Sequence, residues 1–385
     1  MKERFDALHR QPGFVVGGWQ MRPSLALSAG YDNNITLASA GAASSAALGL
    51  RGNIDAVFQG DLYAIELGAS AGHTWYPSSS GNDVTGITLR ASLSHELGAG
   101  ARMRLSSGFA EGTEQGRNSG IIIDGVFEPY ATRPAFRRIP VEAALEFARG
   151  PLSAALSARA ENSDVDPLST QSGLVLRQDF RNGWESEVRL RTSYELHPEL
   201  ELFAEGSALA RRYDDAGADN DVWQALVGGR FELTRLLLGQ VHAGIAVQSF
   251  PNGGSSSGFS FGARFRWFPD ELLTITLEAD RDAGAEVERF GGVSLAVPVT
   301  RDSLKIRAEF EPLRTLMVFG QAGFEEDVRD GDARRESALS LSAGAAYAMT
   351  ANLKLQADCE YLAGTSNFAG DFDRFQFNLG VTAAY

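Results

Sequence analysis

The most regular feature of the chain is an alternation of apolar and polar residues with a period of two. It is clearest at the C-terminal end, from Asp373 to Tyr385, where six consecutive odd positions from Phe375 onward are apolar or aromatic. The even positions between them are polar or small, beginning with Arg374 and Gln376. Because successive side chains of a strand point to opposite faces, this pattern predicts a terminal β-strand with one apolar face.

The same alternation recurs along almost the whole chain. In residues 304–311 apolar side chains alternate with charged ones, and residues 259–267 and 273–280 repeat the pattern. We count roughly eighteen such segments, which is within the range of transmembrane barrels. Residues 1–22 precede the first clear strand and are predicted to form a periplasmic N-terminal lead-in, with the barrel covering residues 23–385.

Short and long connections alternate between the predicted strands. The short turns are expected at 59–61, 98–100, 150–151, 197–199, 234–235, 269–271, 312–314 and 350–352. The long, more polar links are expected at 32–45, 76–83, 113–135, 164–182, 213–220, 251–256, 283–299, 328–334 and 365–371. This asymmetry favours an all-β, antiparallel, up-and-down transmembrane β-barrel of about 18 strands over a soluble sandwich. An even number of strands also predicts that both termini are periplasmic.

Composition narrows the choice of class. The chain has 385 residues, 42 of them glycine, and lacks the ~18-residue apolar run of a transmembrane helix. The mean hydropathy of −0.15 is compatible with a barrel that has a polar lumen. A net charge of −14 argues against a nucleic-acid partner. Met1–Asp6 contains no apolar segment of a signal peptide, so we expect a mature or trimmed chain.

Aromatic residues gather near the ends of the predicted strands. They are Trp75, Tyr76, Trp184, Tyr194, Trp223, Trp267, Phe268, Tyr347, Tyr361 and Tyr385. In a barrel they are expected to form two girdles at the membrane interfaces. The alternative is that they are ordinary core or edge aromatics.

Charged side chains mark the face predicted to line the lumen. The cations are Arg90, Arg189, Arg191, Arg230, Arg264, Arg266, Lys305 and Arg307, and the acids are Glu66, Glu201, Glu205, Glu278, Asp280, Glu325, Asp358 and Glu360. Because neighbouring strands lie ~4.8 Å apart, rows of opposite charge can pair across the wall. Such pairs could simply stabilise the barrel, or they could form a track that guides a polymer or ions.

The sequence contains little that predicts enzymatic chemistry. Ser70 and Ser260 lie in Gly-x-Ser-x-Gly matches, but both fall inside alternating strands rather than at the strand-to-helix turn of a nucleophile elbow. The five histidines are scattered, and Cys359 is the only cysteine and falls on an apolar face. We therefore expect no catalytic residue, no metal site and no cofactor, with an outer-membrane hydrolase as a remote alternative.

Two of the predicted loops carry apolar segments. Residues 120–129 within the link 113–135, and residues 290–298 within the link 283–299, are unusually apolar for extracellular loops. Each could extend the wall above the membrane or fold inward as a constriction. For 113–135 the first arrangement is favoured, and whether the lumen is open is not decided by the sequence.

A set of spaced residues stands out near the start of the chain: Gly13, Gly17, Trp19, Pro23, Ser24, Tyr31, Asp32, Asn34 and Ile35. This set resembles the opening pattern of a family of outer-membrane β-barrel porins associated with exopolysaccharide secretion. Residues 194–214 resemble the family's mid-barrel hairpin, and residues 236–240 and the terminal strand also fit. The links 113–135 and 283–299 are not diagnostic, and some strand ends carry Ala where the family has Tyr.

The resemblance implies a barrel in the bacterial outer membrane that passes a polymer or solutes. The expected function is an export channel for exopolysaccharide, with a general or solute-specific porin, or a non-transporting surface-polymer anchor, as alternatives. The expected partners are outer-membrane lipid and lipopolysaccharide, the barrel assembly machinery and, through the resemblance, exopolysaccharide and periplasmic export components.

Overall fold

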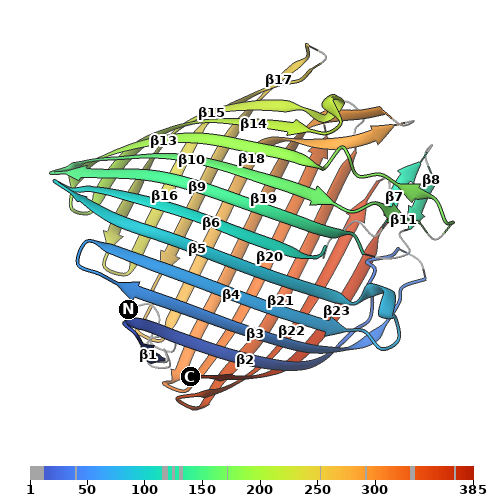
Figure 1. Cartoon of the computed structure of the whole chain (residues 1–385), viewed down its shortest axis with the longest axis horizontal. Coiled ribbons are helices and arrows are strands. Elements are labelled where there is room, and N and C mark those ends of the chain that lie inside the picture. The colour runs from blue at the N-terminus through green and yellow to red at the C-terminus, as the bar shows by residue number, and fades with distance from the viewer. Residues whose placement is uncertain are drawn as a thin grey trace.

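The chain forms a closed barrel of antiparallel strands, here in a computed structural model (Figure 1). The structure describes residues 13–39, 41–114, 120–123, 126–129, 133–170, 172–251, 253–290, 293–329, 334–367 and 370–385. Eighteen strands make the wall, and each pairs with its neighbour in the chain, which confirms the predicted fold class.

The wall strands differ in length but follow one another in simple order. They are β2 (Trp19–Asp32), β3 (Ser45–Gln59), β4 (Tyr63–Trp75), β5 (Val84–Gly98), β6 (Ala101–Thr113), β9 (Ala135–Arg149), β10 (Leu152–Val165), β13 (Gly183–His197), β14 (Leu200–Tyr213), β15 (Asn220–Thr234), β16 (Leu237–Ser249), β17 (Ser255–Trp267), β18 (Leu273–Phe290), β19 (Val293–Leu313), β20 (Leu316–Arg329), β21 (Arg335–Thr350), β22 (Leu353–Ser366) and β23 (Phe372–Ala384).

Shorter elements decorate the ends of this wall. They are β1 (Phe14–Val16), β7 (Gly120–Ile123), β8 (Val126–Pro129), β11 (Leu168–Ser169), β12 (Val175–Leu176) and the single 3₁₀ turns η1 (Ser80–Asn82) and η2 (Ala216–Ala218). β1 pairs with β2, so the sheet begins before the predicted start at Pro23, and β2 itself begins at Trp19. The rest of the predicted lead-in, residues 1–12, lies outside the described residues.

The last strand closes the barrel by pairing with the first. β23 is antiparallel to β2 from Ser24↔Ala384 to Asp32↔Gln376, and it pairs with β22 on its other edge. The amide of Tyr385 also donates to the carbonyl of Pro23 at 3.0 Å. The strand that showed the clearest alternation is therefore the one that removes the open sheet edges.

Short turns lie at one end of the barrel and long loops at the other (Figure 1). We call these the turn end and the loop end. All eight predicted turns occur where the sequence placed them, and both described chain ends lie at the turn end. In the turn between β5 and β6, Gly98 and Gly100 have φ angles of +85° and +80°, which glycine adopts without the penalty of a Cβ.

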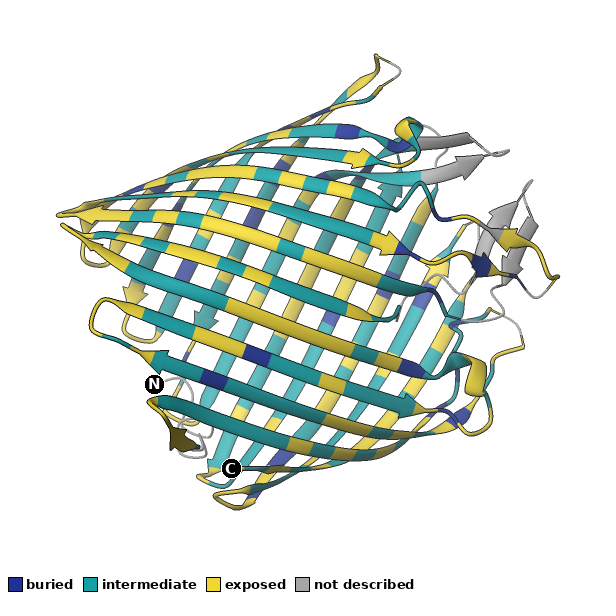
Figure 2. Cartoon of the chain, in the orientation of Figure 1, coloured by how far each residue is buried: buried dark blue, intermediate teal, exposed yellow. Residues whose placement is uncertain are grey.

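The alternation of the sequence becomes two faces of the wall. Exposed and partly exposed residues alternate along several stretches of the wall, including most of β23 (Figure 2). In β19, Leu304 and Ile306 are 50% and 46% exposed, and Lys305 and Arg307 lie on the opposite face. Because apolar side chains cover the outside, that surface suits lipid, and the polar face encloses the lumen.

One predicted loop is wrong. Residues 283–299 are mostly strand: β18 and β19 continue their pairing through Ala283↔Thr300 to Phe290↔Val293. Alternation persists through Ala283, Ala285 and Val287, so the local pattern is that of a strand. In the predicted link 113–135, β6 ends at Thr113 and β9 begins at Ala135, and between them β7 and β8 pair with each other and with no other described strand.

Candidate functional site

Ion pairs join neighbouring strands on the lumen face, as the charge pattern predicted. Arg191 and Arg189 on β13 each lie 3.6 Å from the carboxylate of Glu205 on β14. Two further pairs are Arg230–Glu201 at 3.5 Å and Arg264–Glu278 at 2.8 Å. Each joins adjacent strands, because these residues lie on the same face and nearly opposite one another.

Other predicted lumen residues are held differently. Arg307 pairs within its own strand with Glu309 at 3.0 Å, and Asp358 accepts a hydrogen bond from Gln356 at 3.2 Å. Arg90 reaches past β4 to Asp55 on β3. It passes over Gly68, where an added Cβ would lie 2.4 Å from the Arg90 Nε.

A third group has no ion-pair partner within the described ranges. It comprises Arg266, Lys305, Asp280 and Glu360, and the Nε of Arg266 is buried without a hydrogen-bond acceptor. The lumen therefore carries paired charges together with a few that are available to a passing solute.

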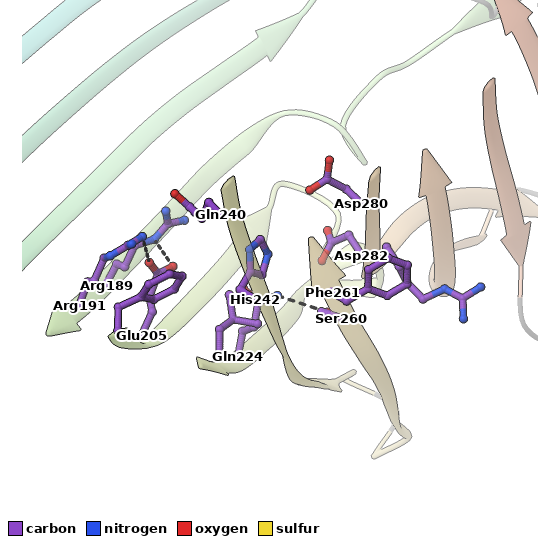
Figure 3. Close-up of a pocket in the computed structure, with 13 residues that line it drawn as sticks. Arg189, Arg191, Glu205, Gln224, Gln240, His242, Ser260, Phe261, Asp280 and Asp282 are labelled. Carbon is purple, nitrogen blue, oxygen red and sulfur yellow. Dashed lines mark hydrogen bonds and ion pairs between the residues drawn. The ribbon is translucent and has the colours of Figure 1, made fainter. Parts of the chain in front are cut away.

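The ion-paired strands surround a cavity on the lumen side of β13–β18 (Figure 3). Its volume is about 330 Å³, and polar side chains line most of it. Gln224 on β15 donates to Ser260 on β17 at 3.3 Å, across the intervening strand β16. Gly262 also lies in this region. A Cβ added there would meet both the His242 ring and a carboxylate oxygen of Asp280, so the lack of a side chain leaves room for these two groups.

An aromatic ring lies under the arginines of this cavity. Phe203 is 6% exposed on the inner face of β14, and the guanidinium carbon of Arg191 lies 3.7 Å from the centre of its ring. Gly228 on β15 leaves room for the ring, since a Cβ there would lie 2.5 Å from Phe203. The sequence analysis missed this contact, although Phe203 stands between Glu201 and Glu205 on the polar face and breaks the alternation.

Most of the predicted girdle aromatics lie on the outer face. Tyr194, Trp267, Tyr347 and Tyr385 are exposed near the turn end, and Trp75, Trp184 and Trp223 near the loop end. Tyr361 is outward but lies farther from a strand end. Along β13, the ten residue steps from Trp184 to Tyr194 span roughly 33 Å, or about 25 Å along the axis at the usual tilt, which matches a membrane's apolar band.

Tyr76 and Phe268 do not belong to a girdle, which corrects that prediction. Each follows the end of a strand, and they are 5% and 6% exposed. Tyr76 packs with Ile35 and Val84 in a small core between loops at the loop end. Burial, together with the nearby carboxylate of Asp32, raises the pKa of the Tyr76 hydroxyl above its ordinary value.

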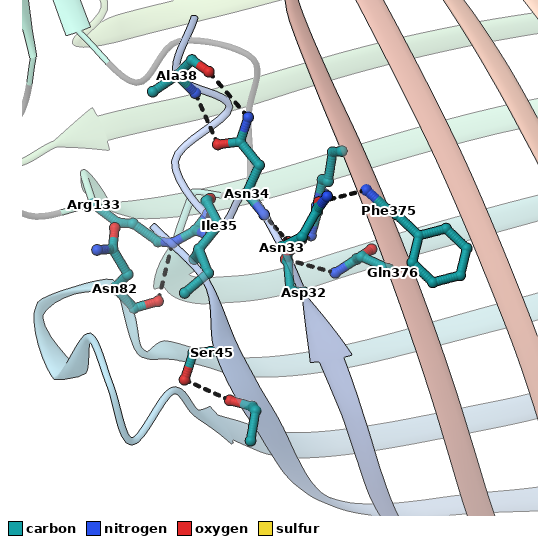
Figure 4. Close-up of polar contacts among 12 residues, drawn as sticks. Asp32, Asn33, Asn34, Ile35, Ala38, Ser45, Asn82, Arg133, Phe375 and Gln376 are labelled. Atoms are coloured by element: carbon teal, nitrogen blue, oxygen red, sulfur yellow. Dashed lines mark hydrogen bonds and ion pairs between the residues drawn. The ribbon is translucent and has the colours of Figure 1, made fainter. Parts of the chain in front are cut away.

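A buried network of hydrogen bonds joins β2 to β23 at the loop end (Figure 4). We call the pairing of these two strands, which closes the barrel, the seam. Asp32 is fully buried and accepts hydrogen bonds from Arg374 at 2.6 Å and from Gln376 at 2.9 Å. Its other oxygen accepts from the amide of Asn34 at 2.9 Å, and the Asn34 side chain donates to the carbonyl of Asp373 at 2.8 Å. The Tyr-Asp-x-Asn sequence thus ties the end of β2 to β23.

Arg133 extends this fastening to the neighbouring loops. Its guanidinium donates to the carbonyls of Ile35 and Asn82 at 2.9 and 3.0 Å. Burial lowers the pKa of Arg133, and the carbonyl acceptors compensate for part of the lost hydration. Together these contacts make the loops beside the seam one packed unit.

At the opposite side of the loop end, the wall divides between β17 and β18. Their pairing runs from Trp267↔Ile275 to Phe261↔Arg281 and then stops, although both strands continue. Figure 1 shows the tip of β17 standing apart from the ends of β18 and β19. We call the continuing hairpin, residues 282–290 and 293–300, the strap.

The strap lies on the lumen side of β17. A Cβ added to the inward-facing Gly258 would lie 2.4 Å from the Cβ of Ala283, which belongs to the outward face of β18. β18 also contacts β16 directly, and β19 contacts η2. Ala246 and Gln248 on the inner face of β16 are consequently buried, at 0% and 2% exposed. Of the two arrangements considered for this segment, the structure has the inward one.

The described residues contain neither a metal-binding cluster nor a membrane-spanning helix. Among them, no group of three His, Cys, Asp or Glu side chains is arranged to hold a metal ion. No helix in the described ranges is long and apolar enough to cross a membrane. Ser70 and Ser260 both lie inside wall strands, β4 and β17.

Comparison with known proteins agrees with this geometry. Residues 6–385 match the family model described as Putative beta-barrel porin 2. No curated protein matches the sequence. Among solved structures, OccK1 (OpdK) of Pseudomonas aeruginosa is similar, with a TM-score of 0.52, 12% identity, and coverage of 95% of this chain and 99% of that one.

A second similar structure is the ferric enterobactin receptor PfeA of Pseudomonas aeruginosa, in a mutant form. It matches with a TM-score of 0.51 and 8% identity, covering 95% of this chain and 80% of that one. At these identities the likeness concerns the fold alone.

Proposed function

Because the chain belongs to the Putative beta-barrel porin 2 family of outer-membrane barrels, we propose that it is a channel whose cargo is a hydrated, uncharged or charge-balanced molecule. The observation that carries this proposal is the inner face of the closed wall, where arginines and carboxylates neutralise one another in pairs such as Arg230–Glu201 and Arg264–Glu278. Barrels of 16–18 strands enclose an aqueous lumen, and paired charges give such a lumen polarity without a strong field of one sign.

Exopolysaccharide is the first candidate cargo. The sequence motifs resemble porins associated with its secretion, and a polymer rich in hydroxyl groups would find many hydrogen-bonding partners along this wall. Export would also fit an orientation in which the turn end, with both chain ends, faces the periplasm, where export components could dock.

A general or solute-specific porin is the second candidate, and the paired charges favour it equally. A wall without a dominant charge sign admits small solutes of either sign. A third possibility, a surface-polymer anchor that does not transport, would make the lumen only a scaffold.

Two measurements separate these functions. Purified protein in a planar bilayer should give stepwise conductance, and a strain lacking the gene should lose surface polysaccharide if the barrel exports it. Conductance with normal surface polysaccharide would indicate a porin. A complete lack of conductance, also after removal of the strap, would contradict any channel function and favour the anchor.

A further inference from the structure

The strap and the tip of β17 present two strand edges that face each other without pairing. Residues 255–260 of β17 pair with β16 on one side, and no described strand pairs with their other side. Residues 282–287 of β18 pair with β19, and their other edge is likewise unpaired in the described part of the chain. Unpaired backbone groups in a strand edge favour the addition of a partner strand.

The register for such pairing is already set. The last pair of the ladder is Phe261↔Arg281, and continuing it by one residue at a time would bring Ser260 opposite Asp282 and Ser255 opposite Val287. No slip of either strand is required, so all side chains would keep their present faces. The strap would then become part of the wall and leave the lumen.

The contact between the strap and β17 itself is small. Gly258 and Ala283 meet there, and the tip of β17 begins with three serines, Ser255–Ser257, rather than with large apolar residues. Opening would therefore expose little apolar surface of β17, although the contacts of the strap with β16 and η2, which bury Ala246 and Gln248, would also have to break.

On its other side the strap remains attached to the wall. β19 pairs with β20 as far as Val299↔Arg329. The carboxylate of Glu286 lies 2.8 Å from Arg329 on β20 and 3.0 Å from Arg301 on β19. One edge of the strap is thus paired with the wall, whereas its other edge has no strand partner within the described residues.

We propose that the strap is a gate at the mouth of the channel. In the closed state, which the structure holds, it lies against the inner face of β17. In the open state, residues 282–287 pair with residues 255–260 and the lumen widens beside the cavity lined by Asp280 and Asp282. This gate rests on the proposed channel function, since it regulates passage through the same lumen.

Engineered disulfides can trap each state in a background with Cys359→Ala. The pair G258C/A283C should fix the closed state, after the strap moves outward by about 1.4 Å to reach the usual Cβ–Cβ distance of ~3.8 Å. The pair S257C/A285C should fix the open state, because the extended register places these two residues opposite each other. The pair A263C/A279C is the control, since Ala263 and Ala279 are already opposite each other in the wall.

Each pair would be oxidised, its disulfide verified by mass spectrometry, and its conductance measured before and after reduction. We expect oxidised S257C/A285C to conduct more, by about twofold, than oxidised G258C/A283C, and reduction to abolish the difference. The control should form its disulfide without a change in conductance.

The outcomes distinguish the gate from the channel. Failure of S257C/A285C to form a disulfide under conditions in which the control does would overturn the gate, as would equal conductance of the two trapped states. If no variant conducts even when reduced, the channel itself is refuted, whereas disulfide formation would still report whether the strap moves.

Discussion

At the scale of single residues, the seam depends on a buried charge. Asp32 is fully buried and carries two hydrogen bonds from Arg374, at 2.6 and 3.0 Å. Removing one member of a buried ion pair leaves the other charge without compensation. We therefore expect D32N to lower the free energy of unfolding by about 3 kcal/mol, measured by urea titration in lipid vesicles.

The control for this substitution is E96Q, at an exposed pair. Glu96 and Arg102 form an ion pair with side chains 46% and 47% exposed. Exposed ion pairs contribute at most about 1 kcal/mol to the free energy of unfolding, so E96Q should be almost as stable as the native chain. An equal decrease in the free energy of unfolding of both variants would mean that burial does not make the Asp32–Arg374 pair more important than an exposed pair.

Three lumen arginines test whether the wall influences the choice of ion. Arg264 is neutralised by Glu278, Arg307 by Glu309, and Arg266 has no ion-pair partner in the described ranges. Replacing all three with Gln removes three positive charges, so the reversal potential in a salt gradient should shift toward cation selectivity.

R266Q alone removes one of these three charges and should produce part of that shift. A reversal potential unchanged in the triple variant would refute a guiding role for these charges and leave them a structural one.

At the scale of elements, β23 is required for closure. A chain truncated at Asp373 keeps the other strands but leaves the edges of β2 and β22 open, and such edges cannot be satisfied in lipid. We expect the truncated chain not to insert, measured by protease protection and by heat-modifiable migration in detergent gels. Normal insertion would disprove the role assigned to this strand.

Sequence patterns were sufficient to predict the positions of the strands and turns, but not how far along their length two neighbouring strands pair. Period-two alternation and turn residues such as Gly98 and Gly100 are local, so the eight turns could be located. Where β18 departs from β17, Ala283 packs on Gly258, and neither residue has a local sequence signal that would predict this contact.

The sequence likewise predicted which charged residues share the lumen face, but not all of their partners. Alternation placed Arg230 and Glu201 on one face, and strand order made them neighbours. It could not decide between partners in adjacent strands and partners two residues away, as in Arg307–Glu309. Tyr76 was misplaced because the folding of a loop, not the strand before it, determines its burial.

At the scale of the whole molecule, the barrel separates lipid from water by a wall one strand thick. Leu379 and Asn378 are adjacent at the middle of β23, and both are exposed. The side chain of Leu379 is 51% exposed on the apolar outer face, and Asn378 lies on the lumen face beside Asp358. An arginine on the lipid side at mid-membrane costs about 2–4 kcal/mol, whereas lumen positions are tolerant. We expect L379R to lose that much stability and N378R to lose far less, measured by equilibrium unfolding in lipid vesicles. Since the two residues share strand, depth and neighbours in sequence, only the side of the wall differs, and equal losses would mean that the faces have been assigned wrongly.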